Sequence, residues 1–196
     1  MILYLHGFRS APASIKARAL QQRMAARGLG AAFWCEQLPA SPREAIALIE
    51  AQIAHCAARN MTVTLVGSSL GGYYATFLAE RHGLRAVLVN PAVVAALELQ
   101  AYVGVQTNLY TNTSFDFTPA HLAELRALEV PGLSHPERCW LLVETGDEVL
   151  DYRHAVQKYA GARQTVLEGG NHGFSRWDDH LDAVIAFAGL DAQGPG

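Results

Sequence analysis

The chain has 196 residues, of which 51% are hydrophobic and 17% are charged, and these proportions are typical of a globular rather than a disordered protein. The formal net charge of −3 offers no basic surface for nucleic acid or for an anionic membrane. No apolar run is long enough to span a membrane, and the first residues lack the basic and apolar regions of a signal peptide. We therefore expect one domain over residues 1–196, located in the cytoplasm.

The spacing of the cysteine and histidine residues gives no sign of a metal centre. The three cysteines, Cys35, Cys56 and Cys139, are far apart, and neither C-x-x-C nor H-E-x-x-H occurs. We expect no metal and no other cofactor, and we interpret each thiol as a small buried hydrophobic group. Residues 191–196 have the composition of a loose tail.

The first half of the chain alternates short apolar runs with segments of helical character. Apolar runs that predict strands lie at residues 2–5, 31–35, 61–66 and 85–89. A helix is expected from Ser14, as its cap, to about Arg27, with Gly28 as its stop. A second helix begins at the capping box Ser41-Pro42-Arg43-Glu44. Its apolar face consists of Ile46, Ile49, Ile53 and Cys56.

The stretch from Ala92 to His135 has a different pattern. Two helices are expected, one over residues 93–102 and one from Thr118, as its cap, to Leu128. Residues 107–116 are polar and aromatic without a clear period, so the pattern does not predict a pair of strands there. We interpret residues 92–135 as a small helical cap over the neighbouring site. The alternative is an ordinary crossover with a long surface loop.

The last part of the chain returns to the alternation of strand and helix. Strands are expected at residues 139–144 and 164–167, and helices at residues 152–159 and from about Ser175. The whole pattern predicts an α/β fold with a mainly parallel sheet, helices on both faces and right-handed crossovers. A site in such a fold lies at the carboxyl ends of the strands. The polar segments that follow strands in this way are residues 6–8, 67–71, 144–147 and 169–172.

The segment Gly67-Ser68-Ser69-Leu70-Gly71 has the G-x-S-x-G spacing of a nucleophile elbow. It stands between the strand that ends at Val66 and a helix expected to include residues 73–78. A serine on such a turn has a strained backbone, and glycines on both sides allow close packing because they carry no Cβ. The N-terminus of the helix directs free N–H groups at the same place. Taken alone, the pattern also fits a glycine-rich turn without chemistry.

Ser69, Asp147 and His172 follow one another in the order of nucleophile, acid and base found in α/β-hydrolases. In this interpretation His172 accepts the proton of Ser69, and Asp147 holds the imidazole in the correct tautomer. The oxyanion would lie between the backbone N–H groups of Leu70 and Phe8. Taken alone, Asp147 also suits a turn or a helix cap, and His172 an ordinary loop. Their joint position at strand ends favours the triad.

A set of motifs extends along nearly the whole chain. The motifs are Tyr4-Leu5-His6-Gly7-Phe8-x-Ser10-x-Pro12, the elbow continued through Ala75, Asn90-Pro91-Ala92, Tyr102-Val103-Gly104, Asn108-x-Tyr110-Thr111, Thr145-Gly146-Asp147-Glu148-Val149-Leu150-Asp151 and Gly170-Asn171-His172-x-Phe174. With this set the chain resembles the YqiA-type small bacterial esterases. The resemblance implies esterase activity and a compact α/β-hydrolase fold that lacks the first antiparallel strands of larger members. It places nucleophile, acid and base at Ser69, Asp147 and His172. Departures at Leu109 and Ala95-Ala96 lie in the insertion and bear on substrate preference rather than on the reaction.

The sequence therefore predicts a serine hydrolase that cleaves a small-molecule ester or thioester through an acyl-enzyme. Tyr102 and Tyr110 of the insertion are expected in the substrate pocket. Asp147 is expected to orient the histidine, and Asp151 to cap the following helix. His6 is interpreted as an orienting hydrogen-bond partner in its loop. The alternatives are an acyltransferase or peptidase with the same triad, and a non-catalytic binding protein of the same fold. The oligomeric state does not follow from the sequence.

Overall fold

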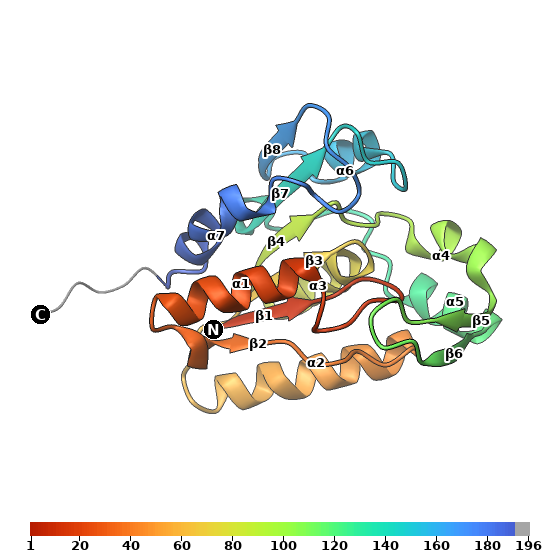
Figure 1. Ribbon diagram of the computed structural model, residues 1–196, viewed down its shortest axis with the longest axis horizontal. Helices are drawn as coiled ribbons and strands as arrows, with labels where there is room; N and C mark the ends of the chain where they lie inside the picture. The colour runs from red at the N-terminus through yellow and green to blue at the C-terminus, as the bar shows by residue number, and fades with distance from the viewer. Residues whose placement is uncertain (191–196) are drawn as a thin grey trace, which may run out of the picture.

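The computed structural model describes residues 1–190, and the tail expected at residues 191–196 lies outside the described residues. Six parallel strands form one sheet in the order β2-β1-β3-β4-β7-β8, and two antiparallel strands form a separate hairpin (Figure 1). The strands of the sheet are β1 (Ile2–Leu5), β2 (Phe33–Trp34), β3 (Thr64–Ser68), β4 (Arg85–Val89), β7 (Cys139–Glu144) and β8 (Arg163–Leu167). The hairpin consists of β5 (Gly104–Thr107) and β6 (Ser114–Phe117).

Helices cover both faces of the sheet, as the alternating pattern predicted. The α-helices are α1 (Ile15–Ala26), α2 (Pro42–Ala57), α3 (Leu70–His82), α4 (Ala95–Glu98), α5 (Pro119–Ala127), α6 (Tyr152–Lys158) and α7 (Leu181–Phe187). Short 3₁₀ turns are η1 (Gly30–Ala32), η2 (Gln100–Tyr102), η3 (Pro136–Arg138) and η4 (Trp177–His180). Helices α1 and α7 pack on one face, and α2, α3, α5 and α6 contribute to the core on the other.

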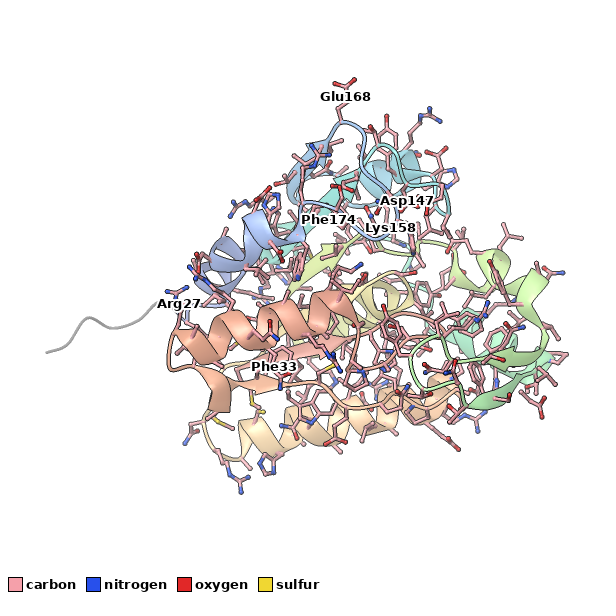
Figure 2. The ribbon with its side chains drawn as sticks, viewed as in Figure 1. Arg27, Phe33, Asp147, Lys158, Glu168 and Phe174 are labelled. Carbon is pink, nitrogen blue, oxygen red and sulfur yellow. The ribbon has the colours of Figure 1, made fainter. Side chains whose placement is uncertain are left out.

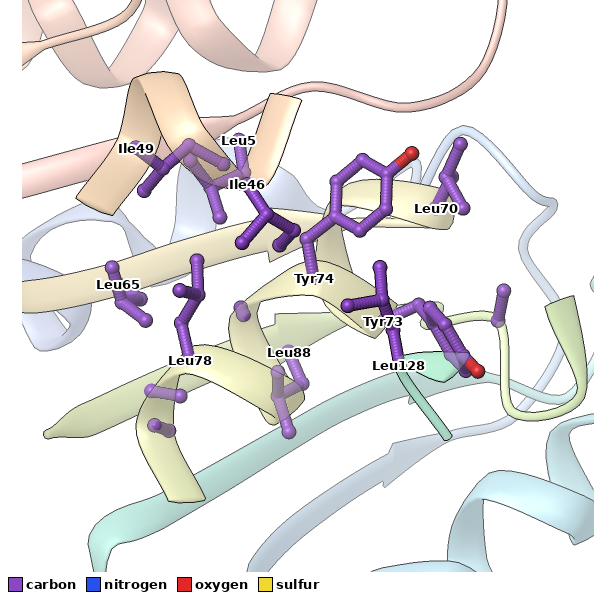
Figure 3. Packing of buried hydrophobic residues seen from close by; sticks show 14 of the residues in the cluster. Leu5, Ile46, Ile49, Leu65, Leu70, Tyr73, Tyr74, Leu78, Leu88 and Leu128 are labelled. Carbon is purple, nitrogen blue, oxygen red and sulfur yellow. The ribbon is translucent and has the colours of Figure 1, made fainter. Parts of the chain in front are cut away.

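Side chains of the central strands alternate between two buried cores. In β1, Ile2 and Tyr4 pack toward α1 and α7, whereas Leu3 and Leu5 pack toward α2 and α3. Figure 3 shows this second core, in which Leu5 lies beside Ile46 of α2. Successive residues of a strand point to opposite faces, so a strand buried on both faces is apolar throughout. The continuous apolar runs of the sequence therefore belong to central strands.

The predicted helix starts are confirmed at three caps. The side chains of Ser41, Thr118 and Asp151 each accept a hydrogen bond from a backbone N–H two or three residues further on, at 3.2, 3.4 and 3.0 Å. Ser14 also occupies the cap position of α1, but its hydroxyl makes no cap hydrogen bond. Gly28, with φ of +72°, follows the end of α1 in the left-handed conformation that glycine adopts without strain.

The insertion between β4 and β7 contains a pair of strands that the sequence analysis did not expect. Residues 107–116 belong to the β5–β6 hairpin, in which Gly104 pairs with Phe117 and Thr107 with Ser114. The prediction that this stretch holds no pair of strands was wrong. Each strand has four residues, and β5 is largely exposed, so too few apolar residues alternate to produce a period. The helix expected over residues 93–102 is instead the short α4 followed by the 3₁₀ turn η2.

The hairpin is attached to the loop that follows β1. The ring of Phe8 packs edge-on against Phe115 and Phe117, with centroids 5.7 and 5.0 Å apart. The backbone N–H of Leu109 donates to the carbonyl of Arg9 at 2.8 Å. Figure 1 shows α4, α5 and the hairpin at the end of the molecule toward which the strands of the sheet point. The insertion therefore lies at the edge of the sheet where a site is expected.

The packing of α3 on the sheet gives a prediction about stability. A Cβ atom on Gly71 would lie 1.9 Å from the carbonyl oxygen of Leu5, which is backbone and cannot move aside like the end of a flexible side chain. We expect Gly71→Ala to lower the free energy of unfolding by about 2 kcal/mol or more. Thermal melting measures this change, and Gly132→Ala is the control because its Cβ would meet nothing within 4 Å. Equal melting temperatures for the two variants would contradict the packing described.

Candidate active site

Ser69 lies in a tight turn between β3 and α3. Its backbone has φ of +54° and ψ of −121°, a conformation that costs free energy for any residue with a Cβ. The turn is fastened to the end of β4, since the Ser69 N–H donates to the Val89 carbonyl at 3.1 Å and the Ser69 carbonyl accepts from Ala92 at 3.1 Å. Ser69 is partly exposed, whereas its neighbours Ser68 and Leu70 are buried. The strained turn therefore presents the Ser69 side chain at the surface of the sheet edge.

His172 lies in the loop after β8 and contacts Asp147, which follows β7. The Nδ1 atom of His172 is 3.0 Å from Oδ1 and 2.9 Å from Oδ2 of Asp147. The same Oδ1 accepts from the backbone N–H groups of Val149 and Leu150, each at 2.9 Å. Burial raises the pKa of Asp147, but the hydrogen bonds from His172 and the two backbone groups outweigh it and lower the pKa below its usual value. An ionised Asp147 accepts from Nδ1–H and so favours the tautomer whose Nε2 can accept a proton.

Ser69 and His172 line the same two pockets. The α1 pocket, a cavity of about 410 Å³, also includes Lys16 and Tyr110. The cap pocket, of about 320 Å³, also includes Tyr102. Its other lining residues include Glu98, Leu99, Val149 and Leu150. The two tyrosines expected in one substrate pocket therefore lie in different pockets, which share Ser69 and His172.

The backbone N–H groups of Phe8 and Leu70 belong to two segments that lie close together, the loop after β1 and the start of α3. Leu70 is the first residue of α3, and Phe8 belongs to the loop after β1. Neither N–H donates a hydrogen bond to any group within residues 1–190. The loop is close to the elbow, because a Cβ atom on Gly7 would be 3.2 Å from the Cβ of Ser69. The loop after β1 therefore lies against the elbow, and the N–H groups of Phe8 and Leu70 have no acceptor within the described residues.

His6 holds the loop after β1 in place through hydrogen bonds of its ring. Its Nε2 accepts a hydrogen bond from the Leu38 backbone N–H at 3.0 Å, and its Nδ1 lies 3.0 Å from the carbonyl oxygen of Gly7. Burial lowers the pKa of His6, so the neutral imidazole that this pairing needs is favoured. His6 is therefore a hydrogen-bond partner in its loop, as the sequence indicated.

Glu144 holds the His172 loop, a role that the sequence analysis did not identify. The buried carboxylate accepts hydrogen bonds from the backbone N–H groups of Asn171 and Ser175 at 2.8 and 2.9 Å, and from Arg176 Nε at 3.0 Å. Burial alone would raise the pKa of Glu144, but these donors outweigh it and hold the pKa at about 2. One feature of the sequence could have identified this role: Glu144 is a single carboxylate at the end of an otherwise apolar strand. A buried charge requires hydrogen-bond or ionic partners, so such a residue is expected to hold neighbouring segments.

Asn90 and Glu148 hold His172 itself. The side-chain amide of Asn90 donates to the carbonyl oxygens of Asn171 and His172 at 3.0 and 3.1 Å, and its Oδ1 accepts from the Glu144 N–H. The Glu148 carboxylate accepts from the backbone N–H of His172 at 2.9 Å. Both the N–H and the carbonyl group of His172 are therefore hydrogen-bonded to side chains.

The remaining expectations concern Asp151, metals and membranes. Asp151 is exposed, caps α6 and forms an ion pair with Arg153, and it makes no hydrogen bond or ion pair with His172.

The described residues hold no group of three or more side chains suited to a metal ion. Within residues 1–190 no helix combines the length and apolarity needed to cross a membrane.

The parallel sheet, the turn at Ser69 and the loops after β7 and β8 define an α/β-hydrolase fold, and solved structures agree. The chain is similar to the monoacylglycerol lipase of Paleococcus ferrophilus, with 16% identity and a TM-score of 0.68 over 97% of this chain and 94% of that one. It is also similar to Est1E from Butyrivibrio proteoclasticus, with 13% identity and a TM-score of 0.64 over 96% and 85% of the two chains. Mouse alpha/beta hydrolase domain-containing protein 10 gives 16% identity and a TM-score of 0.64 over 94% and 89%. Likeness at these identities concerns the fold.

The chain belongs to the uncharacterised protein family UPF0227, whose model matches residues 1–189. This is the YqiA-like family that the motifs indicated.

The Glu144 network predicts a pH dependence of stability. The folded-state pKa of about 2 lies below the ordinary value of 4.5, so the stabilisation is complete above pH 4.5 and is lost as the pH falls toward 2. We expect Glu144→Gln to lower the free energy of unfolding at neutral pH, because an amide replaces one accepting oxygen with a donor. We also expect a smaller loss between about pH 5 and pH 2 than in the wild type.

Urea unfolding at a series of pH values measures both effects. Glu168→Gln is the matched control, because Glu168 belongs to the same loop and projects into solvent (Figure 2). Parallel pH dependences for Glu144→Gln and the wild type would contradict the assigned role.

Proposed function

We propose that the protein is a serine hydrolase that cleaves carboxylic esters or thioesters through an acyl-enzyme. The observation that carries the proposal is the strained Ser69 turn, whose serine shares two pockets with His172, the partner of Asp147. A serine hydroxyl is a weak nucleophile at its own pKa and needs an adjacent base. Backbone strain at Ser69 costs stability, and such strain is found where a residue has a functional role.

In the proposed mechanism, His172 Nε2 takes the proton from Ser69 Oγ as that oxygen attacks the carbonyl carbon. The N–H groups of Phe8 and Leu70 stabilise the oxyanion of the tetrahedral intermediate, and the imidazolium is stabilised by Asp147. The bond to the leaving oxygen or sulfur then breaks, and His172 returns its proton to the leaving group. Water, activated by His172 in the same way, hydrolyses the acyl-enzyme and releases the acid.

The two pockets suggest how a substrate lies. The cap pocket has an apolar wall that includes Leu99, Tyr102 and Leu150, so it suits the acyl chain. The α1 pocket shares Ser69 and His172 with the cap pocket and includes Tyr110, so we assign the alcohol or thiol part to it. A small ester or thioester fits both volumes. The cytoplasmic location stays a prediction from the sequence.

The roles of the two neighbouring aspartates give the test of this proposal. In Asp147→Asn the amide oxygen can still accept from Val149 and Leu150, but its NH₂ group would face His172 Nδ1 and favour the wrong tautomer. We expect a fall in kcat of roughly 10⁴-fold with the fold intact. Asp151→Ala is the matched control, for which we expect a loss of about 1 kcal/mol of stability through the missing cap and near-normal activity.

Steady-state kinetics on a phenyl ester and thermal melting of both variants provide the comparison. If Asp151→Ala were the inactive variant and Asp147→Asn retained turnover, the assignment of the acid would be wrong.

A further inference from the structure

Lys16 places a cation in the α1 pocket without a counter-ion. Lys16 lines this pocket together with Ser69 and His172. Its ammonium donates to the carbonyl oxygen of Gly173 at 2.7 Å. Among the ion pairs of residues 1–190, none includes Lys16. The ammonium has three donors, and one carbonyl satisfies only one of them.

The surroundings of Lys16 make a free anion a favourable partner. Burial lowers the pKa of Lys16 to about 8, although the charges of Asp147 and Glu144 act in the opposite direction. These two carboxylates are already engaged, Asp147 with His172 and Glu144 with Arg176. A poorly hydrated ammonium gains more from an anionic acceptor than a fully solvated one does.

The N-terminus of α1 adds to the positive potential in this pocket. Ser14, the cap residue of this 12-residue helix, also lines the pocket and is 7% exposed. Its hydroxyl is buried and has no hydrogen-bond partner within the described residues. Free N–H groups at a helix N-terminus favour a negative charge.

The cap pocket is a poorer place for an anion. It contains Glu98, whose Oε2 is buried and has no partner in residues 1–190. A second carboxylate or a phosphate beside Glu98 would be repelled or would require Glu98 to be protonated. Charged side chains of both signs line each pocket, because the exposed Asp178 also lines the α1 pocket and Arg9 also lines the cap pocket. The pockets differ in the charged group that burial affects most, which is the Lys16 ammonium in the α1 pocket and the Glu98 carboxyl in the cap pocket.

We propose that Lys16 determines specificity by binding a carboxylate or phosphate on the leaving-group part of the substrate, so that the preferred esters or thioesters are anionic. This inference rests on the proposed hydrolase function, and it deepens it by naming the substrate class. The competing interpretation is that Lys16 only holds the His172 loop through Gly173. A loop role would affect neutral and anionic substrates equally, which makes the two interpretations separable.

The test compares three butyrate esters that differ in charge: phenyl butyrate, 3-(butyryloxy)benzoate and 3-(butyryloxy)phenyl phosphate. For Lys16→Met we expect kcat/KM for an anionic ester to fall by about tenfold or more, with a much smaller change for phenyl butyrate. Lys16→Arg, which keeps the charge, should retain a preference for the anionic esters. The ester that loses more identifies carboxylate or phosphate as the recognised group.

Lys158→Met is the matched control. Lys158 is the other lysine of the chain, and its ammonium likewise donates to a backbone carbonyl, that of Val130. Burial also lowers its pKa, but it lines neither the α1 pocket nor the cap pocket. An equal loss on all three esters in Lys16→Met, or no loss on any, would overturn the proposal.

Calorimetric titration with 3-hydroxyphenyl phosphate, the leaving group of the third ester, separates this inference from the proposed function. Binding that Lys16→Met weakens by about tenfold and Lys158→Met leaves unchanged supports the anion site, even if the wild type hydrolyses none of the esters. In that case the hydrolase proposal fails and the site stands. The same titration with 3-hydroxybenzoate, the leaving group of the second ester, tests the carboxylate, and equal binding of both compounds by wild type and Lys16→Met would overturn the site.

Discussion

The close contact between α3 and β1 is the constraint on which the candidate site depends. Because Gly71 has no side chain, the start of α3 can lie directly against the carbonyl of Leu5, which brings the Ser69 turn beside the loop after β1. The loop that carries Gly7 and Phe8 is a neighbour of Ser69 for this reason. The ring of Phe8 in turn packs on the hairpin, so the same contact sets where the insertion covers the site. A larger residue at this point would displace several groups together.

The histidine is positioned by a separate set of interactions. Glu144 holds the loop after β8 with a buried carboxylate, and Asn90 ties that loop to the end of β4. The end of β4 also bonds to the backbone of Ser69 through Val89 and Ala92. The Ser69 turn and the His172 loop are thus both hydrogen-bonded to the end of β4. The buried side chains of Glu144 and Asn90 have hydrogen-bond partners there. Such a network makes a rigid arrangement, which proton transfer between two side chains requires.

The sequence predicted what depends on local patterns and missed what depends on contacts. Apolar runs, caps and the G-x-S-x-G spacing identified the main strands and helices and the four polar segments at strand ends, because each of those signals lies within a few residues. The hairpin was missed because strands of four residues leave too little alternation. The roles of Glu144 and Lys16 depend on partners 27 or more residues away, so no local pattern could reveal them. The extent of the domain and the catalytic roles themselves stay predictions.

Covalent labelling of Ser69 tests the central claim most directly. A fluorophosphonate reacts with a serine only where a base activates the hydroxyl and an oxyanion site receives the phosphoryl oxygen. Intact-protein mass spectrometry and peptide mapping of the folded protein should find one adduct, on Ser69. The adduct should be absent in Ser69→Ala and greatly reduced in a folded His172→Ala variant. A folded wild-type protein that forms no adduct on Ser69 would contradict the account and favour a non-catalytic binding protein.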